Sequence, residues 1–561
     1  MSQWLAWSFL FTVPGLVLGS TGAVKRPGLA SIPGPIAILA LAVAWLVGAG
    51  QPTAIELGGW LPFVPDGRFL LRVDALSAFM LGVLGLVSAC VYVYSLGYLE
   101  GDPGIRRFFA FLDVFVGAMA LLVTAGNLAV LLIGWTGVGM TSFFLISFWR
   151  DRPGTLYAGL QAIAANAVGD GALILAAVVV PAGCGDLASL QRCTGGLGGA
   201  PLLAALIVVA ASAKSAQGPL YFWLPSAMAG PTPISALIHA ATMVAAGVYL
   251  LARTYPVLAL TPAAVGATAV LGVVTALFGA VMSLRQTNLK RGLAYSTVSQ
   301  LGYMFAAIGF GAPFAAIFHL GSQAFFKALL FLAAGVVIHA LAGEEELAAM
   351  GGLGRALPAA MLAFVAGSAS LFGLPLTAGA FSKDAILDAG FGIAPLLAWS
   401  LIAGALLSGM YIGRLFFATF YAPPPDEPRH LHPVSPTLIW PLLPLAIGSL
   451  TFGFAQFPLG GLGHVLEPAL GPGEMLSLSS PAGIVAAWLG LLGFIVGTRW
   501  RVRRDEGARP LPERYGWVDW ASSVSVAVAE GFARVQNGRT GRYVLATVLG
   551  FAAILLASRF G

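Results

Sequence analysis

The chain has 561 residues, of which 58% are hydrophobic and only 9% charged, and its mean hydropathy is +0.89. Apolar stretches of about 18 to 25 residues recur from end to end, each long enough to cross a hydrocarbon core about 30 Å thick. This composition excludes a soluble enzyme, since no polar block is large enough for a soluble domain. The net charge of +6 therefore reflects membrane topology and not nucleic-acid binding.

We predict an all-α polytopic membrane protein with about sixteen transmembrane helices. The first apolar run has no basic residue before it, whereas Lys25 and Arg26 follow it directly. We therefore expect a retained helix with an outer N-terminus and not a cleaved signal peptide. Arginine-rich connections then fall on the inner side, and the C-terminus returns to the outer side. The predicted spans are 4–21, 31–50, 74–97, 107–125, 127–149, 158–182, 200–224, 233–252, 261–284, 291–311, 313–340, 357–388, 393–421, 435–457, 481–499 and 541–559, with the seventh, eighth and twelfth interrupted by proline or glycine.

Lysine is used sparingly, and mostly inside the membrane. Four of the five lysines, Lys214, Lys290, Lys327 and Lys383, lie within or at the ends of apolar runs, whereas the other 24 basic residues are all arginine. Arginine keeps its proton at any accessible pH, but a lysine moved out of water can release one. This bias predicts a proton carrier. The simpler alternative, that a lysine at a helix end extends to the membrane surface, is what we expect of Lys290.

Lys214 stands about one turn before Pro219, which breaks the backbone hydrogen bonding at membrane depth. Broken helices mark ion sites in transporters, and a charge at this depth costs about 2.5 to 3.5 kcal/mol. The alternative is a plain kink that serves packing. His239 is alone in the next apolar helix; it is either a proton relay or a core histidine with satisfied hydrogen bonds.

His319, Gln323 and Lys327 follow one another at intervals of four residues. This spacing places them on one helix face with a rotation of only about 40° per step. A polar stripe in a membrane helix must face protein or water, so we predict a hydrated route; the alternative is a stripe that only hydrogen-bonds neighbouring helices. His339 lies at the far end of the same span.

Lys383 follows another proline-broken segment, and Asp384 comes directly after it. Spans four to eight and nine to thirteen thus each contain a broken helix with a buried lysine, which predicts two inverted five-helix repeats. We divide the chain into N-terminal helices (1–106), a first repeat (107–252), a second repeat (261–421) and C-terminal helices (435–561) with a short lateral segment at 499–540.

Of the three cysteines, Cys184 and Cys193 share one connection, which the topology places outside. An oxidising compartment and this short separation permit a disulfide, with two free thiols as the alternative. Cys90 lies inside a span as a small apolar residue. None of these cysteines has the neighbours of a metal site, and we predict no metal.

Several motifs stand out along the chain. They are GWTGVG at 134–139, KSAQ at 214–217, WLPSAMAGPTPISALIHAATM at 223–243, AYSTVSQLGY at 294–303, AFFKALL at 324–330, FSKD at 381–384 and QNG at 536–538. Together these motifs resemble the antiporter-like L subunit, of the chain 5 type, of respiratory complex I, a family related to cation/proton antiporter subunits. The likeness covers almost the whole chain.

The resemblance implies roles for particular residues. Lys214 would be the central lysine of the first half-channel, His239 the link toward the centre, and Lys383 the terminal lysine of the second half-channel. His319 and Lys327 would continue the polar axis. Apart from the resemblance, we add Asp170 and Lys290 to the candidate proton-transfer residues.

Three positions depart from the family pattern. Thr136 stands where the family has glutamate, Ala167 where it has arginine, and Gln323 where it has a second histidine. Neither threonine nor glutamine can hold a proton reversibly near neutral pH. Either the first half-channel is altered, or Asp170 compensates.

The resemblance implies a proton-translocating subunit, without redox chemistry of its own, of a complex I-like NADH:quinone oxidoreductase in a bacterial-type inner membrane. NADH, quinone, FMN and iron–sulfur clusters are expected in partner subunits, and no cofactor in this chain. Expected partners are other membrane subunits, especially another antiporter-like subunit, and lipid. The alternatives are an ion or inorganic-carbon transport module that works without redox subunits, and a structural paralogue that has lost pumping.

Overall fold

The computed structural model describes residues 2–499, apart from gaps at 22–23, 25, 49, 60–67, 182–183, 195–198, 426–429, 458–460 and 472–479. The chain divides into two compact units, Met1–Ala508 and Arg509–Gly561. The described residues all belong to the first unit. The predicted span at 541–559 and the lateral segment, except for its first residue, lie outside the described residues.

The prediction that the chain is all-α is wrong in one place, the connection between the second and third predicted spans. There β1 (Thr53–Gly59) and β2 (Arg68–Val73) form a two-stranded antiparallel sheet in which Thr53 pairs with Val73. The Arg72 amide also donates to the Thr124 carbonyl (2.7 Å), which ties the sheet to a neighbouring helix connection. Away from hydrocarbon, an extended connection can satisfy its backbone by pairing with itself.

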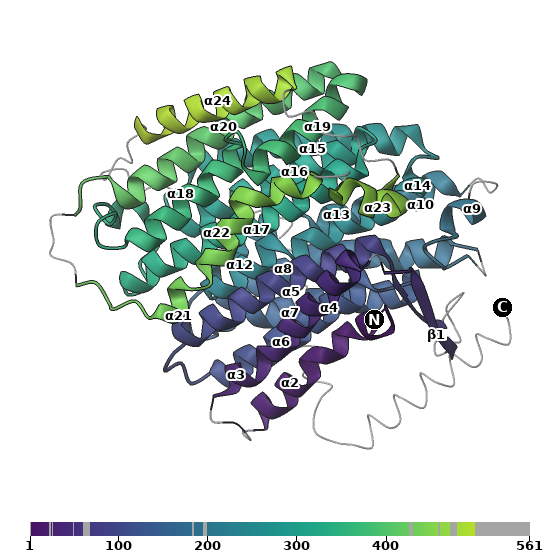
Figure 1. Ribbon diagram of the computed structural model, residues 1–561, viewed down its shortest axis with the longest axis horizontal. Coiled ribbons are helices and arrows are strands. Elements are labelled where there is room, and N and C mark those ends of the chain that lie inside the picture. Colours follow the sequence, from purple (N-terminus) through teal and green to yellow (C-terminus); the bar gives the residue numbers. More distant parts are fainter. Residues whose placement is uncertain are drawn as a thin grey trace. The chain divides into compact units, whose positions relative to one another are not determined.

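The N-terminal helices lie together at one edge of the unit (Figure 1). They are α1 (Ser2–Ala6), α2 (Val13–Ser20), α3 (Pro27–Ser31), α4 (Pro33–Val47) and α5 (Ala75–Tyr98), with a 3₁₀ turn at Ser8–Thr12. The helices of the first predicted repeat follow: α6 (Ile105–Val123), α7 (Leu128–Ile146), α8 (Thr155–Val179), α9 (Leu190–Thr194), α10 (Ala200–Lys214), α11 (Trp223–Ser226), α12 (Thr232–Ala240) and α13 (Met243–Arg253). The short helix α14 (Tyr255–Leu258) lies between the two predicted repeats.

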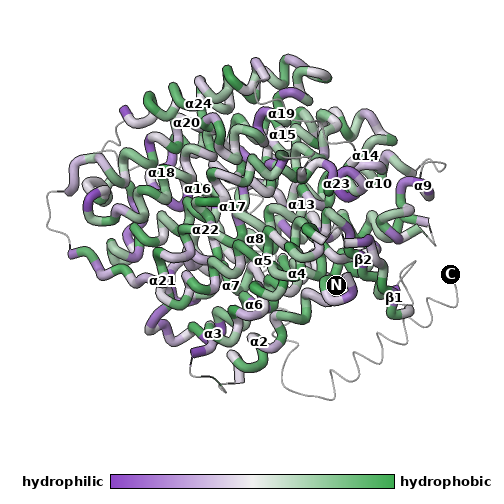
Figure 2. The backbone as a smooth tube through the Cα atoms, viewed as in Figure 1, coloured by the Kyte–Doolittle hydropathy of each residue, from purple (hydrophilic) through white to green (hydrophobic). Residues whose placement is uncertain are grey.

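The second predicted repeat and the described C-terminal helices complete the unit. They are α15 (Pro262–Arg285), α16 (Leu289–Gly309), α17 (Pro313–Ala340), α18 (Pro358–Phe372), α19 (Ala378–Ile393), α20 (Pro395–Phe420), α21 (Pro436–Ile439), α22 (Leu442–Thr451), α23 (Gly461–Leu470) and α24 (Pro481–Arg499). Among the described residues, ten helices are long and apolar enough to cross a membrane by length and composition, and three shorter helices are apolar. Figure 2 shows hydrophobic colour along most helices, with hydrophilic segments concentrated near their ends.

The three predicted interruptions are present. The seventh span breaks after Lys214, where α10 ends, and the twelfth breaks at Gly373, whose φ of +88° is left-handed. The eighth, however, breaks between α12 and α13 at Thr242 and not at its prolines or glycine. The Thr242 hydroxyl donates to the Leu237 carbonyl (2.8 Å), so a side chain takes over a backbone acceptor there.

Helix α17 lies in the middle of the unit (Figure 1) and is almost completely buried. It packs against α5, α12, α16, α18, α19 and α22, and 94% of its most hydrophobic stretch is buried. A helix covered on all sides contacts no lipid, so its polar residues are surrounded by protein.

Candidate proton-transfer site

Lys214 is the last residue of α10 and is completely buried. Its Nζ lies 3.6 Å from Asp170 Oδ1 on α8 and 5.3 Å from the centre of the Trp135 ring on α7. Gly139 on α7 makes room for the amine, since a Cβ there would lie 2.7 Å from Nζ. An aromatic face and a carboxylate both stabilise an ammonium ion, which would be costly to bury without such partners.

Two of the three positions that depart from the family pattern, Thr136 and Ala167, are exposed on α7 and α8. Asp170, by contrast, lies beside Lys214. Sequence reasoning left Asp170 as one of two options, and only the packing of α8 on α10 brings the two side chains together.

The break after Lys214 is stabilised by side chains. The Trp223 indole donates to the Ala213 carbonyl (2.9 Å), the Ser215 hydroxyl to the Val244 carbonyl (2.7 Å), and the Gln217 amide to the Ser215 carbonyl (2.8 Å). Such bonds replace the helical partners that are lost at membrane depth. The lysine therefore sits at a fixed helix end, where the negative end of the helix dipole favours a cation.

His239 lies on the last turn of α12, completely buried, with its ring 4.6 Å from that of Phe331 on α17. Neither ring nitrogen has a hydrogen-bond partner among the described residues. Lys327 and Lys290 are the cations whose fields act on this ring. The structure thus associates His239 with the second predicted repeat as well as with the first.

The stripe predicted on α17 is present and buried. His319 shares hydrogen bonds with Ser382 of α19 (2.9 Å) and Gln300 of α16 (3.2 Å), whereas Lys327 donates to Ser296 of α16. Gln323 contacts the carbonyl of His239 (3.4 Å). The stripe therefore joins α12, α16 and α19, which the sequence could not specify.

Lys383 is buried on α19, and its Nζ donates to the Leu371 carbonyl at the end of α18 (2.6 Å). The amine also lies 5.2 Å from the centre of the Tyr303 ring. Like Lys214, it is held at the carboxyl end of a broken helix. Ser382, the residue before it in the chain, shares a hydrogen bond with His319 (2.9 Å).

Lys290 does not extend to the membrane surface as we expected. Its side chain is only 2% exposed, and Nζ donates to Glu345 Oε1 (2.9 Å) and to the Gly230 carbonyl (3.0 Å). The loop after α17 supplies Glu345, whose carboxylate stabilises the buried ammonium, so the side chain does not extend to solvent. Sequence reasoning missed Glu345, although a run of three glutamates at 344–346 in the connection after α17 was a visible signal.

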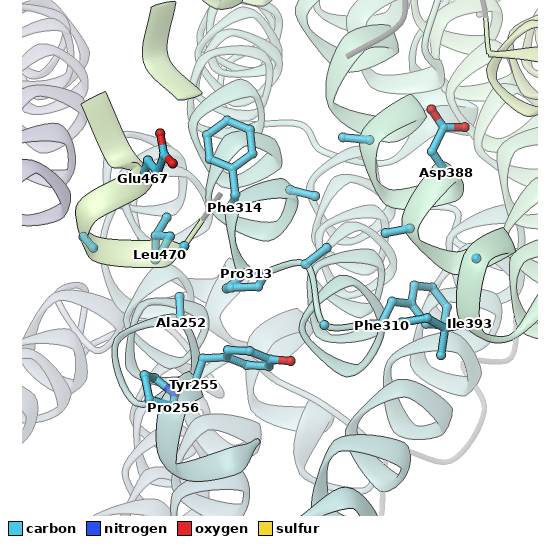
Figure 3. Close-up of a pocket in the computed structure, with 18 of the residues that line it drawn as sticks. Ala252, Tyr255, Pro256, Phe310, Pro313, Phe314, Asp388, Ile393, Glu467 and Leu470 are labelled. Carbon is cyan, nitrogen blue, oxygen red and sulfur yellow. The ribbon is translucent and has the colours of Figure 1, made fainter. Parts of the chain in front are cut away.

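A cavity of about 880 Å³ lies at the amino end of α17. Figure 3 shows Asp388 and Glu467 on opposite sides of it, with Pro313 and Tyr255 between them. Asp388 is one helical turn beyond Asp384 on α19, and the fields of these two carboxyls act on each other. We call this space the outer cavity, since the predicted topology puts its lining segments outside.

Cys90 is a buried free thiol, as expected of a residue inside a span, and Cys184 is disulfide-bonded. The side chain of Cys193 lies outside the described residues, so the pairing of Cys184 with Cys193 stays a prediction. Within the described part of the chain, no group of three or more His, Cys, Asp and Glu residues is placed to hold a metal ion.

Two family models match the sequence. The model described as NADH:quinone oxidoreductase/Mrp antiporter, TM, matches residues 125–408, about half of the chain, and the model of the complex I chain 5 N-terminus matches residues 60–109. The chain belongs to the NADH:quinone oxidoreductase/Mrp antiporter family.

Relatives in this family include NADH-quinone oxidoreductase subunit L of Escherichia coli (strain K12), which is 42% identical over 75% of this chain and 71% of that protein. Subunit L of Mycobacterium tuberculosis (strain CDC 1551 / Oshkosh) is 38% identical over 79% of this chain and 72% of that protein. NADH-ubiquinone oxidoreductase chain 5 of Metridium senile is 42% identical over 72% and 69%.

Solved structures show the same antiporter-family fold. A chain of the Mrp complex from Dietzia sp. DQ12-45-1b superposes with a TM-score of 0.79 at 26% identity, over 99% of this chain and 62% of that one. A chain of the membrane-bound sulfane sulfur reductase, an archaeal respiratory membrane complex, superposes with a TM-score of 0.76 at 19% identity, over 98% and 99%.

Proposed function

We propose that the chain is a proton-translocating membrane subunit, without redox chemistry of its own, of a complex I-like NADH:quinone oxidoreductase. The observation that carries the proposal is the set of buried lysines and histidines held on broken helices and on α17. A membrane protein retains such costly groups where ions or protons move. The relatives named as subunit L and chain 5 support the same reading.

The lysines of the two half-channels, Lys214 and Lys383, are suited to load and release protons. Lys214 and Lys383 each lie at the carboxyl end of a helix, which favours the ammonium, and each is buried, which favours the amine. With these tendencies opposed, a small change in neighbouring charge moves a proton on or off. The amines thus act as the proton carriers, and His239, His319 and Lys327 relay between them.

We infer that Asp170 replaces the carboxylate that the family keeps at position 136. The 3.6 Å approach to Lys214 supports this role, because an acidic partner at that distance biases the lysine toward its charged form. Asp170 is itself 22% exposed, so its charge remains open to influence from a partner subunit packed on α8.

The partner assignments follow from the relatives. Because those relatives are subunits of multi-subunit membrane complexes, we propose other membrane subunits as partners, with another antiporter-like subunit adjacent. NADH, FMN, iron–sulfur clusters and quinone would be bound by partner subunits. We further propose two inverted repeats, sixteen spans, and both termini on the outer side of a bacterial inner membrane.

A second candidate is an ion transport module that works without redox subunits. The Mrp complex supports it, since one of its chains superposes over 99% of this chain. The uncharged residues Thr136, Ala167 and Gln323 at family positions also favour it. Co-purification of the chain distinguishes the candidates: redox subunits in the isolated complex favour the first, and their absence favours the second.

The test is Lys383→Arg in the assembled complex reconstituted in vesicles. Arginine keeps the charge beside Leu371 but does not release a proton, so we expect proton flux to fall by at least about a hundredfold while assembly is retained. Flux is followed with a pH-sensitive dye and assembly by gel filtration.

The matched control is Lys25→Arg, the same exchange in a predicted inner connection, which should leave flux unchanged. Normal flux in Lys383→Arg would contradict a carrier role for this lysine.

A further inference from the structure

A second cavity, of about 380 Å³, lies at the carboxyl end of α17. We call it the inner cavity, since the predicted topology puts its lining segments inside. It is bounded by the ends of α5 and α17 and by the connections that follow α7, α17 and α20. The titratable or charged side chains that line it are Tyr98, Arg152, His339, Glu345 and His432.

Two histidines meet in this cavity from segments far apart in the sequence. His339 is half-buried on the last turn of α17, and His432 is exposed, its amide bonded to the Ala340 carbonyl (2.9 Å). The field of His432 acts on the His339 ring. Histidine is the side chain whose charge changes near neutral pH, so this wall of the cavity can exchange protons with water.

Glu345 joins the cavity to the protein interior. Its carboxylate is 30% exposed on the cavity side, whereas its partner Lys290 is 2% exposed, and 2.9 Å separates Oε1 from Nζ. Asn288 donates to the other carboxylate oxygen (3.1 Å), which fixes the orientation of the group. One side chain therefore touches both water and a buried amine.

Lys290 in turn contacts the start of α12, the helix that carries His239. Its Nζ donates to the carbonyl of Gly230, directly before α12, and the Tyr98 hydroxyl contacts Thr232 on the first turn of that helix (3.0 Å). The fields of Lys290 and Lys327 both act on His239 at the other end of α12. The amine thus lies between the inner cavity and the start of α12.

We propose that the inner cavity is a proton inlet for the second half of the chain, with Glu345 and Lys290 as its first two carriers. The inference rests on the proposed function and deepens it, because it gives His239 and Lys327 an entrance that does not pass through Lys214.

The proton balance is simple. A protonated histidine, or water, gives its proton to the Glu345 carboxylate, and the resulting carboxyl gives it to the neutral amine of Lys290. This step regenerates the carboxylate and leaves the ammonium–carboxylate pair that the structure contains. The ammonium then releases the proton toward His239 or Lys327. Arg152, whose guanidinium stacks 3.7 Å above the Trp149 ring, and Tyr98 are the other titratable or charged groups that face the cavity.

The test compares proton flux in vesicles containing the complex with Lys290→Arg, Glu345→Gln or Glu346→Gln. Lys290→Arg keeps the ion pair but cannot pass a proton on, so flux should fall at least about tenfold while the thermal stability of the complex is unchanged. Proton flux should fall similarly in Glu345→Gln, because an amide takes up no proton. Glu346→Gln, the same change in the adjacent exposed residue, should retain wild-type flux.

Replacing both His339 and His432 by alanine gives a separate readout. The variant should flatten the dependence of flux on inner pH between about 6 and 8. Wild-type flux in Lys290→Arg would overturn the inlet, since it would show that the pair is only structural. A wild-type complex that moves no protons would overturn the proposed function and the inlet with it, whereas loss of flux confined to Lys214 variants would overturn the inlet alone.

Discussion

At the residue scale, the chemistry at Lys214 depends on what surrounds the amine. The Nζ atom is enclosed by Asp170, the Trp135 ring and the bare backbone of Gly139. A glycine at this position looks like generic membrane helix in the sequence. In the structure it determines how closely α7 approaches the lysine.

Gly139→Ala tests this arrangement. The added Cβ would lie 2.7 Å from Nζ, so the flexible amine must shift away from its present position beside Asp170. We expect proton flux to fall several-fold while the free energy of unfolding changes by no more than about 1 kcal/mol, because alanine favours the helix. Flux in vesicles and thermal unfolding in detergent are the measurements.

Gly171→Ala is the control, since an added Cβ there meets no atom within 4 Å. Equal flux in both variants would show that the position of the Lys214 amine is not critical.

At the element scale, broken helices need anchors. Helix α13, the second half of the broken eighth span, is anchored at its end by Arg253, whose guanidinium donates to Asp74 (2.9 Å to Oδ1) and to Ser77 (2.9 Å). Asp74 precedes α5 and caps it by accepting from the Ser77 amide (3.0 Å). One carboxylate therefore holds the end of α13 and the start of α5 together.

This anchor predicts a pH dependence of stability. Burial alone would raise the pKa of Asp74, but the charge and hydrogen bonds of Arg253 prevail and lower it from 3.8 to about 2. A carboxyl group whose pKa is lower in the folded state stabilises the fold at pH values above its ordinary pKa. This stabilisation is lost as the pH falls from about 4 to 2. The contribution at neutral pH is about 2 kcal/mol.

Asp74→Asn should therefore lower the free energy of unfolding by at least about 2 kcal/mol at pH 7, and flatten its decline below about pH 4. Denaturant unfolding in detergent across pH gives both quantities. Glu56→Gln, which removes an exposed ion pair with Arg68, should cost less than about 1 kcal/mol. An unchanged acid limb in Asp74→Asn would contradict the anchor.

At the scale of the whole compact unit, α17 connects two cavities. Pro313 and Phe314 line the outer cavity, and Ile338 and His339 line the inner one, so the cavities lie at opposite ends of one helix. With 28 residues, α17 is about 42 Å long, more than the thickness of a hydrocarbon core. The buried stripe of His319, Gln323 and Lys327 lies between the two ends.

Cysteine labelling tests this arrangement. Ala342→Cys lines the inner cavity and Ala469→Cys the outer one, and the background is low because Cys90 is buried and Cys184 is disulfide-bonded. In intact cells, a membrane-impermeant maleimide should label Ala469→Cys, and label Ala342→Cys only after permeabilisation. Labelling of both from one side would contradict the orientation.

Several features of this protein follow from the local sequence alone. Membrane helices follow from the length of apolar runs, the interruptions near Pro219 and Pro375 from the missing amide and fixed φ of proline, and the stripe on α17 from helical periodicity. The motifs also indicated the family, which the comparisons confirm. These features need only neighbouring residues, so they can be read before the helices are packed.

Only the tertiary structure decided which polar groups meet. Asp170 beside Lys214, Ser382 beside His319 and Glu345 beside Lys290 each join different segments, the last two across 63 and 55 residues. Helix faces are equally apolar almost everywhere in this chain, so hydropathy does not reveal which face packs on which helix. The partners of a buried charge depend on that packing, because the charge interacts most strongly with the groups that packing brings within a few ångströms of it.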